Sequence, residues 1–236
     1  MRTYLALGTA LALGVATVAV RADDPPDSEL NPVTGYTETV DVAYASGQRV
    51  RHTVDRGQQG RSVALVSTSA GANPRIAISS SGDSWVVWST DNATSGVFYR
   101  VRDLQTGTWS EEELLSHPAE NSRDPEIVHA GNATWVVYQI TTASSTAIAV
   151  TGIADDAEPF PTVNIVATTG YAGEVDALVH AEAGHVWVTW ADAGQVVGWS
   201  EYDAATGTWG APTFESSAGV GLGAARAGIR AAILIP

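Results

Sequence analysis

The chain has 236 residues, a net charge of −14 and no cysteine. The missing cysteines exclude a disulfide framework, a thiolate metal site and a cysteine nucleophile. All 12 basic residues are arginines, and the acidic balance argues against nucleic acid or an anionic membrane as partner. Abundant glycine (23) and tryptophan (8), without long helical periodicity, favour an all-β fold.

The N-terminal segment resembles an export signal. Arg2 precedes the apolar stretch 5–20, and residues 20–22 (VRA) resemble a small-x-Ala cleavage site. The stretch is shorter than the roughly 18 residues expected of a spanning helix. We therefore expect a signal peptide at residues 1–22 and a secreted or periplasmic mature chain without membrane insertion; an uncleaved anchor is the alternative. Residues 23–32 are acidic and proline-rich, which predicts a linker.

From residue 33 to residue 236 we expect strands and turns arranged around a repeated strand. That strand reads WVVW at 85–88, WVVY at 135–138 and WVTW at 187–190, with starts 50 and 52 residues apart. Strands are predicted before it at 73–79, 124–130 and 175–181, and after it at 97–103, 148–155 and 196–203. A turn such as DLQTGTWS leads into a fourth strand. Four strands in about 50 residues are typical of a β-propeller blade.

The repeated strand is apolar on both faces. Trp85 and Val87 face one way, and Val86 and Trp88 face the other, because alternate residues of a strand point to opposite sides. A sheet with one solvated face would alternate apolar and polar residues. A blade covered by a neighbour on each side explains the pattern, so these tryptophans are predicted to pack in the core.

Three repeats do not close a ring. Residues 39–45, 49–55 and 62–68 are predicted as the second, third and fourth strands of an incomplete first blade. The apolar segment 229–235 (IRAAILI) is expected to supply the innermost strand of that blade, giving a four-bladed propeller without open edges. The alternative is a partial propeller completed by another subunit.

The repeated segments NPRIAIS, WVVW and TGTWS run through residues 33–236 in a pattern typical of exported bacterial proteins. This repeat pattern resembles that of the sialidase-like (BNR-type) β-propellers. The Asp-box S-x-D-x-G-x-T-W of sialidases is not matched, because in DLQTGTW the glycine comes four residues after the aspartate and the tryptophan six. The resemblance implies an arginine triad around a ligand carboxylate, and Arg75, Arg123 and Arg226 lie near blade starts. No Tyr/Glu nucleophile pair accompanies them.

A second resemblance concerns carboxylates. The segment SRDPEIV (122–128) resembles the R-D-P stretch of five-bladed glycoside hydrolases, in which the aspartate is a general base. The repeat places Asp124 and Asp176 at or near the starts of innermost strands, with Glu126 and Glu174 close by. Inverting glycosidases need two carboxyl groups ~6.5–9.5 Å apart, one of them with a raised pKa. Asp-Pro is also an ordinary turn dipeptide.

The preferred function is a non-catalytic propeller that binds a glycan or a protein. Candidate ligand contacts are Arg75, Arg123 and Arg226 with the third-strand aromatic residues Tyr99, Trp199 and Tyr202. The alternative is a glycoside hydrolase that uses Asp124, Asp176, Glu126 and Glu174. His129 and His180 share a repeat position, but their strand parity places them between blades, so neither a metal nor a cofactor is predicted.

Overall fold

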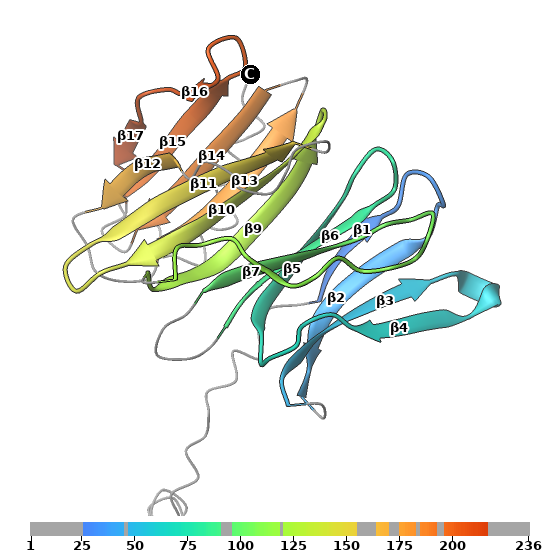
Figure 1. Cartoon of the computed structure of the whole chain (residues 1–236). Coiled ribbons are helices and arrows are strands. Elements are labelled where there is room, and N and C mark those ends of the chain that lie inside the picture. Colours follow the sequence, from blue (N-terminus) through green and yellow to red (C-terminus); the bar gives the residue numbers. More distant parts are fainter. Residues whose placement is uncertain are drawn as a thin grey trace, which may run out of the picture.

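The computed structural model describes residues 26–44, 47–90, 96–118, 120–154, 164–169, 175–182, 185–192 and 196–216. Within these ranges the chain forms four antiparallel sheets that follow one another along the sequence, from blue to red in Figure 1. The all-β prediction is confirmed. In the described ranges no helix is long and apolar enough to cross a membrane.

Each sheet is built from strands that are consecutive in the chain. The first sheet contains β1 (Asp27–Leu30), β2 (Thr37–Ala43), β3 (Arg49–Asp55) and β4 (Arg61–Leu65). The second contains β5 (Ala72–Ile78), β6 (Ser84–Ser89), β7 (Val97–Arg102) and β8 (Glu113–Leu114). The third contains β9 (Ser122–Ala130), β10 (Ala133–Thr141), β11 (Thr146–Ala154) and β12 (Asn164–Thr169). The fourth contains β13 (Val175–Glu182), β14 (His185–Asp192), β15 (Val196–Asp203), β16 (Thr208–Trp209) and β17 (Thr213–Ser216).

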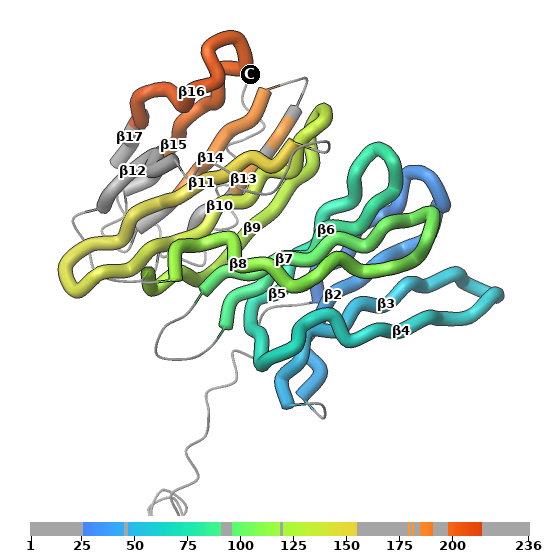
Figure 2. Tube along the Cα trace, in the orientation of Figure 1, coloured from blue at the N-terminus to red at the C-terminus, as the bar shows by residue number. Residues whose placement is uncertain are grey.

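The predicted repeat coincides with these sheets. The tryptophan-rich strands are β6, β10 and β14, each second in its sheet. The first strands contact one another in succession, β1 with β5, β5 with β9 and β9 with β13. The trace in Figure 2 can be followed sheet by sheet in this order. The repeat unit of about 50 residues is therefore confirmed, with four strands in the first three sheets and a fifth short strand, β17, beside β15 in the fourth.

The prediction of a linker at residues 23–32 is wrong where β1 forms, at Asp27–Leu30. This strand pairs with β2, although its sequence DSEL lacks an apolar pattern. Its acidic side chains have a structural role: Asp27 accepts a hydrogen bond from the backbone N–H of Ile76 at 2.9 Å, and Glu29 from that of Ile78 at 2.7 Å. The two carboxylates thus satisfy the free edge of β5, which a hydrophobicity pattern cannot reveal.

The place beside β2 was predicted for the C-terminal segment. It is occupied by β1, so the first sheet has four strands without residues 229–235. Those residues and the signal peptide predicted at 1–22 lie outside the described part of the chain. The second, third and fourth strands predicted for this sheet are β2, β3 and β4.

Among the described residues, the core consists of three apolar clusters, one between each two consecutive sheets. Val40 and Val50 of the first sheet pack on Val86 and Trp88 of the second. In the other direction, the second sheet packs Trp85, Val87 and Tyr99 on Val136 and Tyr138 of the third, which in turn packs Trp135, Val137 and Val150 on Val188 and Trp190 of the fourth. We call the face that packs on the following sheet the outgoing face. The two-sided burial predicted from WVVW is confirmed.

A buried polar network joins the first two sheets. Glu38 of β2 accepts hydrogen bonds from Asn31 (2.8 Å) and Ser84 (2.6 Å) and pairs with Nε2 of His52 at 2.7 Å. Burial opposes ionisation of Glu38, but the hydrogen bonds of His52, Ser84 and Asn31 outweigh it and lower the pKa of this carboxyl group. Asn31 also donates to the backbone carbonyl of Gly82 at 3.0 Å, so the network spans both sheets.

Candidate functional site

The inner strands β5 and β9 carry bulges at equivalent Xaa-Pro steps. Asn73 and Asp124 each precede a proline, and each has a φ of 50°. The register with the neighbouring strand shifts at both places. Asparagine and aspartate tolerate this left-handed region better than other non-glycine residues. The sequence thus places a short polar side chain at the same point of two sheets.

The bulges bring together four predicted site residues. Asn73 Nδ2 donates to Asp124 Oδ1 at 2.5 Å, and Arg75 Nε donates to Glu126 Oε1 at 3.0 Å. Arg123 Nε lies 3.8 Å from Asp124 Oδ2. Arg75, Arg123, Asp124 and Glu126 therefore form one polar cluster between β5 and β9.

This cluster joins β5 and β9 through hydrogen bonds and an ion pair. The Arg75–Glu126 pair is largely withdrawn from solvent, with Arg75 only 9% exposed. Gln139 Nε2 also approaches Asp124 Oδ2, at 3.4 Å. Both carboxylates are thus held by donors, whereas an inverting pair must flank a water molecule and the substrate. Of the other predicted residues, Glu174 and Arg226 lie outside the described part of the chain, as does the side chain of Asp176.

Two predicted aromatic contacts lie between sheets. Tyr99 is 4% exposed and stacks on Trp85 with ring centroids 6.1 Å apart. Burial and the 2.7 Å hydrogen bond to Glu113 raise the pKa of Tyr99. Tyr202 packs on Trp135 with ring centroids 4.5 Å apart. Tyr99 is therefore a packing residue, and Tyr202 is partly one.

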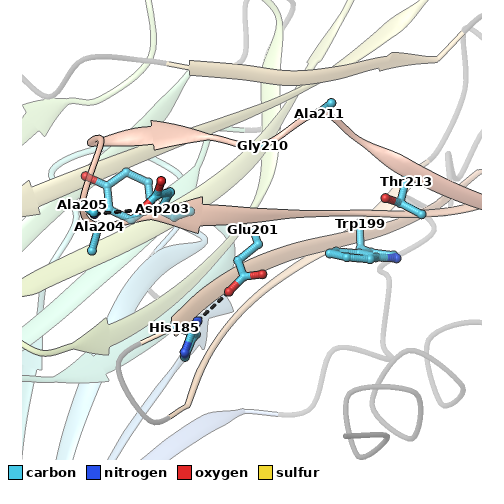
Figure 3. Close-up of a pocket in the computed structure, with 10 residues that line it drawn as sticks. His185, Trp199, Glu201, Asp203, Ala204, Ala205, Gly210, Ala211 and Thr213 are labelled. Atoms are coloured by element: carbon cyan, nitrogen blue, oxygen red, sulfur yellow. Dashed lines mark hydrogen bonds and ion pairs between the residues drawn. The ribbon is translucent and has the colours of Figure 1, made fainter.

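Trp199 lies on an open surface. Its indole is 39% exposed and lines a hollow of about 520 Å³ on the fourth sheet, around β15 and the turn that follows it (Figure 3). The volume falls within the roughly 300–1,000 Å³ typical of ligand sites. The lining residues are His185, Trp199, Glu201, Tyr202, Asp203, Ala204, Ala205, Gly210, Ala211 and Thr213.

Two polar residues of the hollow form a pair that the sequence analysis missed. His185 Nδ1 lies 2.5 Å from Glu201 Oε1, and the two side chains are 58% and 39% exposed. Glu201 and Trp199 are two residues apart on β15 and so share a face, and Figure 3 shows both side chains on the same side of the strand as His185. His185 stacks on Trp187 at 5.4 Å between ring centroids. The sequence could have indicated this pair, because Trp199 and Glu201 lie two residues apart and so share one face of a strand.

The remaining carboxylate of the hollow shapes its turn. Asp203 accepts hydrogen bonds from the backbone N–H of Ala205 at 2.8 Å and from the hydroxyl of Thr206 at 2.9 Å. These bonds lower the pKa of Asp203. The four small residues at positions 204, 205, 210 and 211 leave the hollow open beside this turn.

In the part of the chain that the structure describes, no three side chains of the types His, Asp or Glu gather as metal ligands would. His129, predicted to lie between blades, is half-buried on β9, and its Nδ1 lies 3.2 Å from the hydroxyl of Thr134. The side chain of His180 is not among those described.

Comparison with solved structures defines the class of fold: four antiparallel sheets that match β-propeller structures. A polysaccharide lyase, Uly1, matches with a TM-score of 0.52 at 10% identity, over 81% of this chain and 60% of that one. The catalytic domain of a GH62 α-L-arabinofuranosidase from Coprinopsis cinerea matches with a TM-score of 0.50 at 11% identity, over 79% and 66%. A puromycin hydrolase matches with a TM-score of 0.51 at 16% identity, over 78% and 30%.

These matches concern the fold. The chain spans less than two thirds of the length of each of the three structures. No protein-family model matches the sequence, and no curated protein does. The resemblance to β-propeller proteins implied by the repeat is confirmed, and the function has to be argued from the side chains.

Proposed function

We propose that this chain is an exported, non-catalytic β-propeller module that binds a carbohydrate in the hollow of the fourth sheet. Export rests on the signal peptide predicted at residues 1–22. The binding role rests on one observation above all: the outgoing face of the fourth sheet departs from those of the second and third at the positions that line the hollow.

Strand register gives the equivalence residue by residue. The second-strand tryptophan is paired with Val101 in the second sheet, with Gly152 in the third and with Glu201 in the fourth. The next pair along is Val87 with Tyr99, then Val137 with Val150, then Thr189 with Trp199. The fourth sheet therefore has the carboxylate of Glu201 where the second and third sheets have valine and glycine. It also has a threonine, Thr189, where both of those sheets have valine.

These replacements favour contact with a hydrated ligand over packing against a further sheet. A carboxylate buried against another blade would lose its hydration without compensation. In the third sheet, Gly152 leaves room for the ring of Trp135, which a Cβ at that position would meet at 2.7 Å. In the fourth sheet the corresponding position carries Glu201, which is partly exposed and paired with His185. A polar pair beside an exposed indole is typical of a ligand surface.

A carbohydrate is the ligand that this surface fits best. Trp199 offers a flat apolar face, and the His185–Glu201 pair offers fixed hydrogen-bonding atoms next to it. A sugar ring has the matching combination of an apolar face and hydroxyl groups at its edge. Two of the fold neighbours are a polysaccharide lyase and an α-L-arabinofuranosidase, which supports this ligand class by analogy of fold.

The test is binding of the purified protein to a panel of polysaccharides, followed by tryptophan fluorescence and pull-down. Trp199→Ala is expected to weaken binding at least about tenfold, as loss of an aromatic anchor does. Tyr44→Ala is the matched control, because Tyr44 is an exposed aromatic residue (54%) directly after β2, away from the hollow. Binding that is unchanged in Trp199→Ala, or absent from the whole panel, would overturn the proposal.

A glycoside hydrolase is the competing function, and it is tested separately. A panel of aryl glycosides, including a sialoside, is incubated with the protein and with Asp124→Asn. We expect no turnover, because Asp124 and Glu126 are engaged by Asn73 and Arg75. Turnover that disappears in Asp124→Asn would replace the binding proposal with a catalytic one.

A further inference from the structure

The hollow also indicates which carbohydrates it accepts. This inference rests on the proposed carbohydrate binding and specifies its ligand class. Its starting point is the charge of the lining: among the residues that the structure describes, the lining contains the carboxylates of Glu201 and Asp203 and no arginine. With Asp203 held in its turn, Glu201 is the anion that a ligand on Trp199 would meet.

The described arginines near carboxylates lie elsewhere. Arg51 pairs with Asp41 and Arg61 with Asp55 on the first sheet, and Arg75 and Arg123 belong to the cluster between β5 and β9. An acidic sugar in the hollow would therefore bring its carboxylate next to Glu201 without an arginine among the described lining residues to compensate. The net charge of −14 also repels an anionic ligand at long range.

The His185–Glu201 pair determines what the ligand must donate. An ionised carboxylate only accepts hydrogen bonds, so Nδ1 of His185 carries the proton that is shared with Oε1 of Glu201. In the neutral imidazole, Nε2 is then an acceptor, and so is Oε2 of Glu201. Both outward atoms of the pair thus require donors. Hydroxyl groups of a neutral sugar supply them, whereas an anionic group does not.

Trp199 adds a condition on shape. Its exposed ring lies on the same face as Glu201, two residues away along β15. A pyranose whose hydroxyl groups are equatorial keeps one ring face free of polar groups for the indole and directs adjacent hydroxyl groups outward to the acceptors. We infer that the hollow binds neutral polysaccharides of equatorially substituted pyranoses, such as glucans and xylans, and rejects acidic glycans.

The test compares a β-linked glucose hexamer with the matching hexamer of glucuronic acid at pH 8. Isothermal titration in low salt is expected to give at least about fivefold weaker binding of the uronate, the factor that a like charge about 4 Å away produces even with the screening of water. The difference should shrink in 0.5 M salt. Glu201→Gln removes the charge and keeps one oxygen that can accept from Nδ1 of His185, with an amide N–H donor in place of the second oxygen, so it should reduce the discrimination.

The outcomes separate this inference from the proposed function. Uronate binding that equals or exceeds glucan binding, and that Trp199→Ala abolishes, would overturn the ligand class and leave the carbohydrate site standing. Discrimination that persists unchanged in Glu201→Gln would also contradict the inference, because the charge of Glu201 is its cause. Failure of both hexamers and of the polysaccharide panel would remove the proposed function itself.

Discussion

Asn73 and Asp124 lie 51 residues apart in the sequence and are joined by a 2.5 Å hydrogen bond between their side chains. They occupy the same bulge of two successive inner strands, and both have a φ of 50°. A repeat of about 50 residues brings equivalent positions of neighbouring sheets face to face. The bond therefore fixes β5 and β9 to each other at the point where both strands begin.

Replacing Asn73 by aspartate should weaken this connection. The new carboxylate would face Asp124 and could not donate to it, so we expect a loss of about 1–3 kcal/mol in the free energy of unfolding at pH 7. The loss should decrease at pH 4, where one carboxyl group holds a proton. Urea unfolding at both pH values measures this. Asn132→Asp, at an exposed turn, is the control and should change stability little.

The tryptophans of the repeat should differ in their contribution to stability according to burial. Trp135 is 8% exposed and packs on Tyr202 and Trp209, so Trp135→Ala is expected to cost about 3–5 kcal/mol. Trp199→Ala, in the open hollow, should cost about 1 kcal/mol or less. Chemical denaturation compares the two variants. Should Trp135→Ala fail to fold, Trp135→Phe gives a measurable intermediate value. Equal costs at the two positions would contradict the assignment of packing to one and ligand binding to the other.

Glu29 is expected to make stability fall as the pH rises towards neutrality. Burial, the largest cause, raises the pKa of Glu29 to about 7. Its protonated form therefore favours the folded state: the stabilisation is complete below about pH 4.5 and is lost as the pH rises through about 7. With partial exposure discounted, the effect is on the order of 1 kcal/mol.

Glu29→Gln separates this effect from the structural role of the side chain. The amide oxygen can still accept the hydrogen bond from Ile78, but it does not titrate. Relative to the unmodified protein, the variant should gain stability between pH 5 and pH 8. A pH profile identical to that of the unmodified protein would show that Glu29 is ionised throughout.

Glu38 should have the opposite pH dependence. Because its folded-state pKa is lowered, its contribution is present above the pKa of the free side chain and is lost as the pH falls through the folded-state value. Glu38→Ala leaves His52, Ser84 and Asn31 without their shared acceptor and is expected to cost about 3–5 kcal/mol. Thermal unfolding between pH 3 and pH 7 measures both effects. Glu38→Gln should cost less and flatten the acid side of the profile.

Much of the fold could be predicted because its determinants are local. Two-sided apolar strands such as WVVW at 85–88 indicate sheets covered on both faces, and their spacing indicates the unit. β1 could not be predicted in this way: its side chains Asp27 and Glu29 are polar and act on a strand 49 residues away. Nothing local distinguishes such a strand from an acidic linker.

The candidate site was predicted in part for a similar reason. Arg75, Asp124 and Glu126 were identified from their repeat positions, and these positions do meet. Their mutual pairing depends on the alignment of β5 with β9, which periodicity does not give. Trp199 was identified as an aromatic residue of a third strand. Its polar neighbours His185 and Glu201 come together only through the register of β14 with β15.

The succession of faces has a consequence for how such a chain can change in evolution. Each apolar cluster joins one sheet to the next, and the first strand of each unit contacts that of the unit before it. A duplicated unit inserted between the second and third sheets would meet a Trp/Val outgoing face on one side and a matching incoming face on the other. Inserted after the fourth sheet, it would meet Glu201 and Thr189 instead. Growth by duplication is therefore open within the series of sheets and hindered at the hollow, so the proposed binding role would also limit the number of repeats.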